Sequence, residues 1–222
     1  MTRRWLGPLA GVLVCLAVTH AAAQTPRRLA PVDEGGSDPS FGAFRLALRD
    51  IIRKRDLPGL LGVLSAEVRS SASGETGIKE FQAMWNTASP DSALWPTLER
   101  LLALGGTFAS QDGVYEFHAP YVFSRWPDDL DPREYVAITA PRVLVRVPGP
   151  RQGAVLAAVS YALVRRADGA GDPKPGAQYP VVLGDGRAGV VDGAFVRSPL
   201  DYRAAFRKTP GGWRLIHLLA GD

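Results

Sequence analysis

Short strand-like segments fill the second half of this 222-residue chain and restrict its fold more than any other feature. Runs rich in β-branched and aromatic residues recur at 135–138, 143–147, 155–159, 161–166, 179–183 and 189–191. Turn residues separate these runs at close intervals, a pattern typical of a small all-β barrel or sandwich. The longest interruption, residues 167–177, is rich in Gly, Pro and Asp, so we expect an exposed loop there.

The first hundred residues instead show the spacing of apolar residues, every three or four positions, that is typical of helices. Asp38-Pro39 has the form of a helix cap followed by a first-turn proline, so the first helix is expected to begin there. Further helices are predicted at residues 57–64, at 78–85, and in a stretch that begins between 89 and 96 and ends near 104.

The chain ends in a predicted β-hairpin whose second strand, residues 213–219, is apolar on both faces. Such a strand belongs in the middle of a packed structure. We therefore expect an α+β fold in which the helical N-terminal half pairs with this hairpin, residues 40–133 plus 200–222. A small β-barrel, residues 134–199, would be inserted between them. Location of residues 200–222 wholly inside the barrel would refute this division.

The first two dozen residues have the order of a secretory signal peptide. Two arginines precede an apolar run over residues 5–18, and three alanines at 21–23 supply the small residues that a signal peptidase recognises. Residues 1–23 are therefore the predicted signal, and the run is too short to span a bilayer comfortably. We expect a periplasmic or secreted protein with no stable membrane anchor after cleavage. The prolines and glycines of residues 24–39 predict a linker or a disordered tail.

Export would remove the only cysteine, Cys15, and leave neither a disulfide nor a thiol nucleophile. Lipid attachment to Cys15 is disfavoured because the residue before it, Val14, is not small. Without the leader, 24 basic residues face 22 acidic ones. So slight an excess, with no long run of Lys or Arg, gives no reason to expect nucleic acid as a partner.

Between Tyr135 and Val196 the chain resembles a bacterial Src-homology-3 domain. Residues 143–147, Val-Leu-Val-Arg-Val, match the V-x-V-R strand of those domains, and Pro148-Gly149-Pro150 matches the loop after it. Residues 179–191 match the W-x-x-V-x-x-x-D-G-x-x-G-W-V hairpin, and Phe195-Val196 matches the closing turn. Two positions depart from the pattern, since Tyr179 replaces the first tryptophan and Val190 replaces the later aromatic residue.

The flanking residues resemble other proteins. Residues 197–206 and 212–222 are similar to the end of a family of uncharacterised secreted bacterial proteins, with R-S-P-x-D-Y-R-A-x-F and G-x-W-R-x…A-G-D segments. The helical first half is more weakly similar to nuclear-transport-factor-two-like or cystatin-like α+β folds.

The resemblance implies a Src-homology-3-like barrel whose surface groove grips an extended peptide. Arg146, Tyr161 and Tyr179 are the residues from which we expect ligand contacts. The leading hypothesis is therefore an exported, non-enzymatic envelope protein that binds a peptide, peptidoglycan or a protein partner.

Two alternatives stay open. One is a small-molecule-binding or enzymatic pocket in a nuclear-transport-factor-two-like domain, lined by His118, Tyr121 and Trp126. The other is a structural spacer without a ligand.

The chain shows no motif that requires a cofactor or a metal. Residues 184–189 fit G-x-G-x-x-G, but no helix can follow them, so an Asp-Gly hairpin turn explains the pattern better than a dinucleotide site. A cluster of acidic residues, Asp128, Asp129 and Asp131, matches no complete calcium loop. A G-x-S-x-G nucleophile elbow is absent.

The two histidines beyond the leader, His118 and His217, lack the spacing of a zinc-binding helix motif. An acid–base role for His118 would require a nearby carboxylate, such as that of Glu116 or Asp112. His217 lies in the last predicted strand and is expected to be a partly buried structural residue.

Overall fold

The computed structural model describes residues 27–71, 74, 76–149 and 153–221. Its helices are α1 (Pro39–Lys54), α2 (Leu57–Val63), α3 (Ile78–Met84), α4 (Leu94–Ala103) and α5 (Tyr121–Ser124). Its strands are β1 (Leu64–Arg69), β2 (Thr107–Gln111), β3 (Val114–Ala119), β4 (Tyr135–Ile138), β5 (Val143–Arg146), β6 (Val155–Val159), β7 (Leu163–Arg166), β8 (Gln178–Val182), β9 (Ala188–Asp192), β10 (Val196–Arg197), β11 (Arg203–Thr209) and β12 (Gly212–Leu219). The predicted signal peptide, residues 1–23, and its cleavage site lie outside the described residues.

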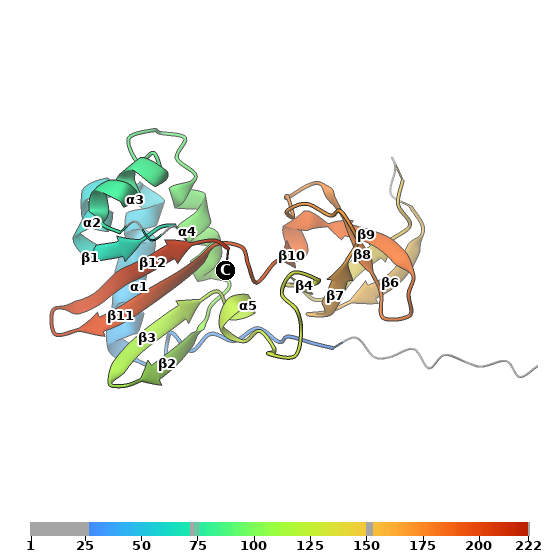
Figure 1. Cartoon of the computed structure of the whole chain (residues 1–222), viewed down its shortest axis with the longest axis horizontal. Helices are drawn as coiled ribbons and strands as arrows, with labels where there is room; N and C mark the ends of the chain where they lie inside the picture. The colour runs from blue at the N-terminus through green and yellow to red at the C-terminus, as the bar shows by residue number, and fades with distance from the viewer. Residues whose placement is uncertain (1–26, 72–73, 75, 150–152, 222) are drawn as a thin grey trace, which may run out of the picture.

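These strands form two sheets, so the architecture is α+β, as predicted (Figure 1). A mixed five-stranded sheet has the order β1-β12-β11-β3-β2, and an antiparallel seven-stranded sheet has the order β10-β4-β7-β8-β9-β5-β6. The second sheet takes consecutive strands, whereas the first takes strands from before and after them. The C-terminal hairpin therefore belongs to the sheet that the N-terminal helices cover.

The predicted helix starts are confirmed. The Asp38 carboxylate caps α1 by accepting hydrogen bonds from the backbone N–H groups of Ser40 and Phe41, at 2.8 and 3.1 Å. Helix α4 begins at Leu94, inside the predicted interval. Pro96 falls in its first turn, where a backbone N–H would have no partner within the helix, so the proline is tolerated.

The sequence does not predict β1 or β2. In β1 the two buried apolar residues, Leu64 and Val68, are four positions apart, a spacing that favours a helix. Strand β1 nevertheless pairs in parallel with β12, with Leu64 opposite Leu215. A partner so distant in sequence overrides the local pattern, because the strand's backbone groups are satisfied only after the chain has folded.

Aromatic side chains fill the space between the helices and the five-stranded sheet. The ring of Phe41 on α1 lies 4.3 Å from that of Phe117 on β3 and 4.8 Å from that of Trp213 on β12, centroid to centroid. Phe206 on β11 joins the same cluster and is fully buried. Helices α1–α4 cover this face, and in Figure 1 helices α1 and α4 lie behind the strands.

Strand β12 lies in the middle of its sheet, between β1 and β11, as its apolar sequence predicts. Simple alternation between two covered faces would account for the apolar residues on both sides of this strand, but a bulge explains part of the pattern. A register shift opposite Ala205 and Phe206 inserts one extra residue, Ile216, into β12. The bulge changes the alternation, so Leu215 and Leu218 both pack into the helix-facing core.

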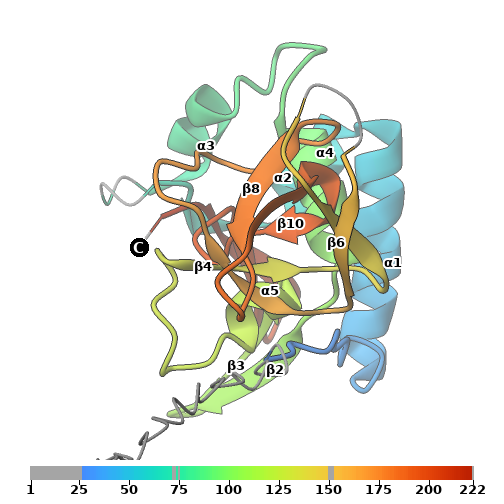
Figure 2. The same ribbon diagram turned by 90° about the vertical axis from the view of Figure 1, so that its right-hand side faces the viewer.

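The seven-stranded sheet contains all six predicted short strands, with ends displaced by at most two residues. It has its own core of mainly aliphatic residues. In Figure 2 the molecule is turned so that this sheet faces the viewer. The predicted closure into a barrel is not found. Within the described residues, β10 and β6 are the two edges and do not pair with each other. Strands β5 and β9 pair at a single position, Arg146 opposite Val190, so the sheet opens where a barrel would be continuous.

Residues 27–38 have fixed partners over their described length and do not form the disordered tail that their breakers predict. Leu29 is buried, and its backbone N–H donates to the carbonyl of Tyr161 at 2.8 Å. Further along, the Glu34 carboxylate accepts a hydrogen bond from the backbone N–H of Phe108 at 2.8 Å. The segment therefore contacts both sheets.

Candidate ligand-binding groove

A groove of about 460 Å³ lies on the seven-stranded sheet where β5 and β9 diverge. The described residues of the two strands pair only at Arg146 and Val190, and residues of both strands line the groove. Gln178 from β8 lines one side, and Phe195, from the short 3₁₀ turn after β9, lines another. The sheet therefore positions the groove through an interruption in its own hydrogen bonding.

Exposed apolar side chains gather at this groove. Leu144 and Phe195 line it, with 40% and 41% of their surface exposed. Val155 on β6 pairs with Arg146 and is 51% exposed. Of the seven large apolar side chains that are exposed in the described part of the chain, four belong to this sheet and its hairpin: Leu144, Val147, Val155 and Phe195. Apolar surface concentrated beside a groove is typical of a binding site.

The charged groups of the groove are mainly basic. Arg142 and Arg146 line it, and within the described residues the Arg142 guanidinium has no hydrogen bond or ion pair. Arg146 donates from Nη1 to the carbonyl of Gly153 at 3.0 Å. The one acidic group, Asp192, accepts hydrogen bonds from two backbone N–H groups, including that of Ala194 at 2.8 Å. Its charge is thus already engaged, which leaves the groove with cationic character.

Of the three predicted contact residues, the structure brings only Arg146 to the groove. Tyr179 packs in the core of the seven-stranded sheet and is 4% exposed, so its ring offers no surface to a ligand. Burial raises the pKa of its phenol. Tyr161 lies in the turn before β7, where its carbonyl accepts the hydrogen bond from Leu29. Both tyrosines were expected to contact the ligand, but in the structure they stabilise the fold instead.

Sequence reasoning missed Arg142, Leu144 and Phe195. A signal for Leu144 exists, because it alternates with Val143 and Val145, which face the core. No comparable signal exists for Phe195, since its position depends on the 3₁₀ turn, where its carbonyl accepts a hydrogen bond from the distant backbone N–H of Thr139 at 2.9 Å.

The alternative pocket residues do not converge on one cavity. Tyr121 and Trp126 belong to a small cluster between the two sheets, and burial raises the pKa of Tyr121 to about 12. Trp126 lines a hollow of about 290 Å³ together with Phe123, and its Nε1 donates to the carbonyl of Leu130 at 2.9 Å. His118 does not line this hollow, although its ring lies 6.4 Å from that of Phe123, centroid to centroid, on the face of the five-stranded sheet opposite to helices α1–α4.

His118 does have the carboxylate partner that an acid–base role would require. Its Nε2 lies 3.1 Å from Oε2 of Glu116. Burial lowers the pKa of His118, and the neighbouring Glu116 raises it in part. Asp112, the other predicted candidate, lies in the β2–β3 turn with a φ of 51°.

The motifs that were considered for cofactors and metals have structural explanations. Residues 184–189 form the β8–β9 hairpin, in which the backbone N–H of Leu183 donates to Arg187 at 2.9 Å, and a strand follows instead of a helix. Asp129 pairs with Arg27 at 2.6 Å. Across the described ranges, no three His, Cys, Asp or Glu side chains lie close enough to hold a metal ion. None of the helices in those ranges has the length and apolar character needed to cross a bilayer.

Comparison of the chain with models of known families, with curated proteins and with solved structures gives no significant match. The resemblance to bacterial Src-homology-3 domains and to secreted bacterial proteins therefore stays a prediction.

Proposed function

We propose that this chain is an exported, non-enzymatic binding protein of the cell envelope. Its seven-stranded unit, residues 134–199, acts as a Src-homology-3-like module that holds an extended peptide segment, supplied by peptidoglycan or by another exported protein. The remaining α+β unit, residues 40–133 plus 200–222, is its scaffold. The observation that carries this proposal is the groove in which exposed Leu144 and Phe195 adjoin Arg142 and Arg146.

The exposed apolar surface gives the groove a driving force for binding. Full burial of a leucine or phenylalanine side chain is worth about 1.5–3 kcal/mol, so covering the exposed two fifths of Leu144 and Phe195 contributes about 1 kcal/mol each. The backbone edges of β5 and β9 add hydrogen-bonding groups suited to an extended chain. The guanidinium of Arg142 favours a ligand with an acidic group nearby.

The alternative of a pocket between the helices and the five-stranded sheet is less well supported. Phe41, Phe117, Phe206 and Trp213 fill that space. A scaffold role agrees better with so closely packed an interior.

A sedimentation assay with purified cell wall tests the proposal. The wild-type protein should pellet with the wall, and Leu144→Ser and Phe195→Ser should lower its affinity about fivefold each, the equivalent of about 1 kcal/mol. Leu46→Ser is the matched control, because Leu46 is an exposed apolar residue of α1, away from the groove, and its replacement should leave binding unchanged.

One outcome narrows the proposal and another contradicts it. If the wild-type protein stays in the supernatant and no free wall peptide binds it either, peptidoglycan is not the source of the ligand, and only an exported protein is left as the source. If both groove variants bind as tightly as the Leu46→Ser control, the groove is not the site.

A further inference from the structure

One row of side chains crosses the face of the five-stranded sheet opposite to helices α1–α4 and contains both histidines of the described chain. The ring of Phe123 on α5 also reaches this face, 6.4 Å from that of His118, centroid to centroid. Strand pairing places Arg69 beside His217, His217 beside Ala205, Ala205 beside His118, and His118 beside Thr107. The row thus runs through β1, β12, β11, β3 and β2 in order. The proposed function makes no use of it.

The neighbours of Ala205 and His118 fix the face on which the row lies. Ala204 and Phe206, on either side of Ala205, pack into the core under the helices. Since successive side chains of a strand point to opposite faces, Ala205 points away from the helices. The same argument applies to His118, because Phe117 and Ala119 are both in that core.

This face carries more positive than negative charge. The next row places Arg214 beside Arg207 and Arg207 beside Glu116. Arg203, two residues before Ala205, lies over the ring of Phe123 at 4.9 Å. With Arg69, this face therefore carries four guanidinium groups, of which Arg69 and Arg207 are close enough to lower the pKa of His217.

The single carboxylate of these rows is already engaged. Glu116 accepts from Nε of Arg207 at 2.8 Å through Oε1, and its Oε2 faces Nε2 of His118 at 3.1 Å. A carboxylate can only accept hydrogen bonds, so Nε2 of His118 carries the proton and Nδ1 is the free nitrogen. Glu116 consequently has little capacity left to balance the charge of Arg69.

The surroundings of both imidazoles disfavour their protonated form. Burial lowers the pKa of His118, and burial together with the nearby cations Arg69 and Arg207 lowers that of His217. Glu116 has the opposite effect on both. A negative group at this face would reverse the balance, because it would stabilise the protonated imidazoles.

We propose that this row is a binding site for an oxyanion, a phosphate or carboxylate group that contacts His118 and His217 together with the guanidinium groups of Arg69 and Arg207. Binding takes up protons from the solvent onto the imidazoles, so affinity rises as the pH falls. The site is independent of the groove on the other sheet, and either can exist without the other.

Histidine titration by NMR tests the proposal through the imidazole signals of His118 and His217, the two histidines that remain after removal of the predicted leader. Inorganic phosphate should raise the pKa of His118 and His217 by about half a unit or more, relative to sodium chloride of the same ionic strength. Because two half-unit shifts are only partly expressed at pH 6, the apparent phosphate affinity should be at least about threefold higher at pH 6 than at pH 8.

Ala205 provides the sharpest variants, because it lies between the two imidazoles. Ala205→Glu introduces a carboxylate there, so it should raise both pKa values without phosphate and abolish the effect of phosphate. Ala205→Gln has the same size without the charge and should leave the phosphate response intact. Arg69→Gln, at the edge strand, should weaken the response even if changes at Ala205 disturb folding.

Further arms distinguish the sources of the anion. Acetate tests a carboxylate, and vesicles containing phosphatidylglycerol test a lipid headgroup by co-sedimentation that Ala205→Glu should abolish. Equal pKa values in phosphate, acetate and chloride would overturn the proposal, and so would a phosphate response that Ala205→Glu and Arg69→Gln leave unchanged.

Discussion

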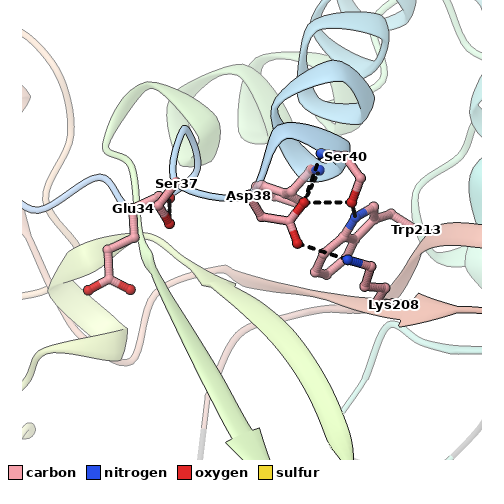
Figure 3. Close-up of polar contacts among 7 residues, drawn as sticks. Glu34, Ser37, Asp38, Ser40, Lys208 and Trp213 are labelled. Atoms are coloured by element: carbon pink, nitrogen blue, oxygen red, sulfur yellow. Dashed lines mark hydrogen bonds and ion pairs between the residues drawn. The ribbon is translucent and has the colours of Figure 1, made fainter.

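The carboxylate of Asp38 joins the start of α1 to the C-terminal hairpin, and we expect its removal to weaken the five-stranded unit markedly. Figure 3 shows it accepting hydrogen bonds at the helix start and pairing with Lys208 at 2.9 Å. It also accepts from Oγ of Ser40 at 2.6 Å. Ser40 Oγ in turn accepts from Nε1 of Trp213 at 3.0 Å. One side chain thus connects residues 38–41 with strands β11 and β12.

The size of the effect follows from these contacts. Loss of a helix N-cap costs about 1 kcal/mol, and loss of an ion pair with a half-exposed lysine costs about 0.5 kcal/mol. Asp38→Ala should therefore lower the free energy of unfolding by about 1.5–2 kcal/mol. Asp38→Asn keeps a capping oxygen and should lower it by about half as much.

Urea unfolding of the full-length protein, followed by tryptophan fluorescence, measures these differences. Asp56→Ala is the matched control, because Asp56 caps α2 through a single N–H, that of Gly59 at 3.0 Å. Its replacement should cost about 0.5–1 kcal/mol. The reasoning is refuted if Asp38→Ala costs less than this control, or if Asp38→Asn is as damaging as Asp38→Ala.

The pH dependence offers a second measurement of the same contacts. Hydrogen bonds from Ser40 and Lys208 hold the pKa of Asp38 well below its ordinary value. The unfolded chain therefore binds the proton first, and the contribution of Asp38 is present above about pH 4 and is lost as the pH falls further. Asp38→Ala should reduce the loss of stability in that acid range.

Three further predictions concern other buried groups. Gly106→Ala should lower the free energy of unfolding, measured by urea titration, by about 2 kcal/mol or more, because the new Cβ would lie 2.1 Å from the carbonyl oxygen of His118. A loss below about 0.5 kcal/mol would contradict this close packing. Tyr179→Phe should leave stability unchanged or raise it by up to about 1 kcal/mol, since the buried hydroxyl has no hydrogen-bond partner in the described structure; a clear loss would show that the hydroxyl is bonded. Burial lowers the pKa of His118 and His217, so the unfolded chain binds more protons and the free energy of unfolding should fall as the pH decreases below about 6.5. His217→Gln should make the dependence of stability on pH less steep, and an unchanged dependence would argue against burial of His217 as its cause.

Much of the candidate groove could not be predicted, although its strand could. The segment around Arg146 is recognisable from its alternation, and Arg146 does reach the groove. Tyr179 was expected there because aromatic residues line such grooves, but it occupies the core, since its strand presents that side inward. Phe195 reaches the groove through a turn whose packing no local pattern specifies.

Local sequence determined the elements whose hydrogen bonds and caps are near in the chain. Asp38-Pro39 specified the start of α1, runs of β-branched and aromatic residues specified the short strands of the second sheet, and the turn residues between them specified the hairpins. Only the tertiary structure decided what depends on distant partners: the parallel pairing of β1 with β12, the open edges that replace a closed barrel, and the bulge at Ile216. The physical reason is the same in each case, because a strand's backbone groups and a side chain's face are fixed by a neighbour far away in sequence. For that reason the histidine row, which spans all five strands, is visible in the fold and not in the sequence.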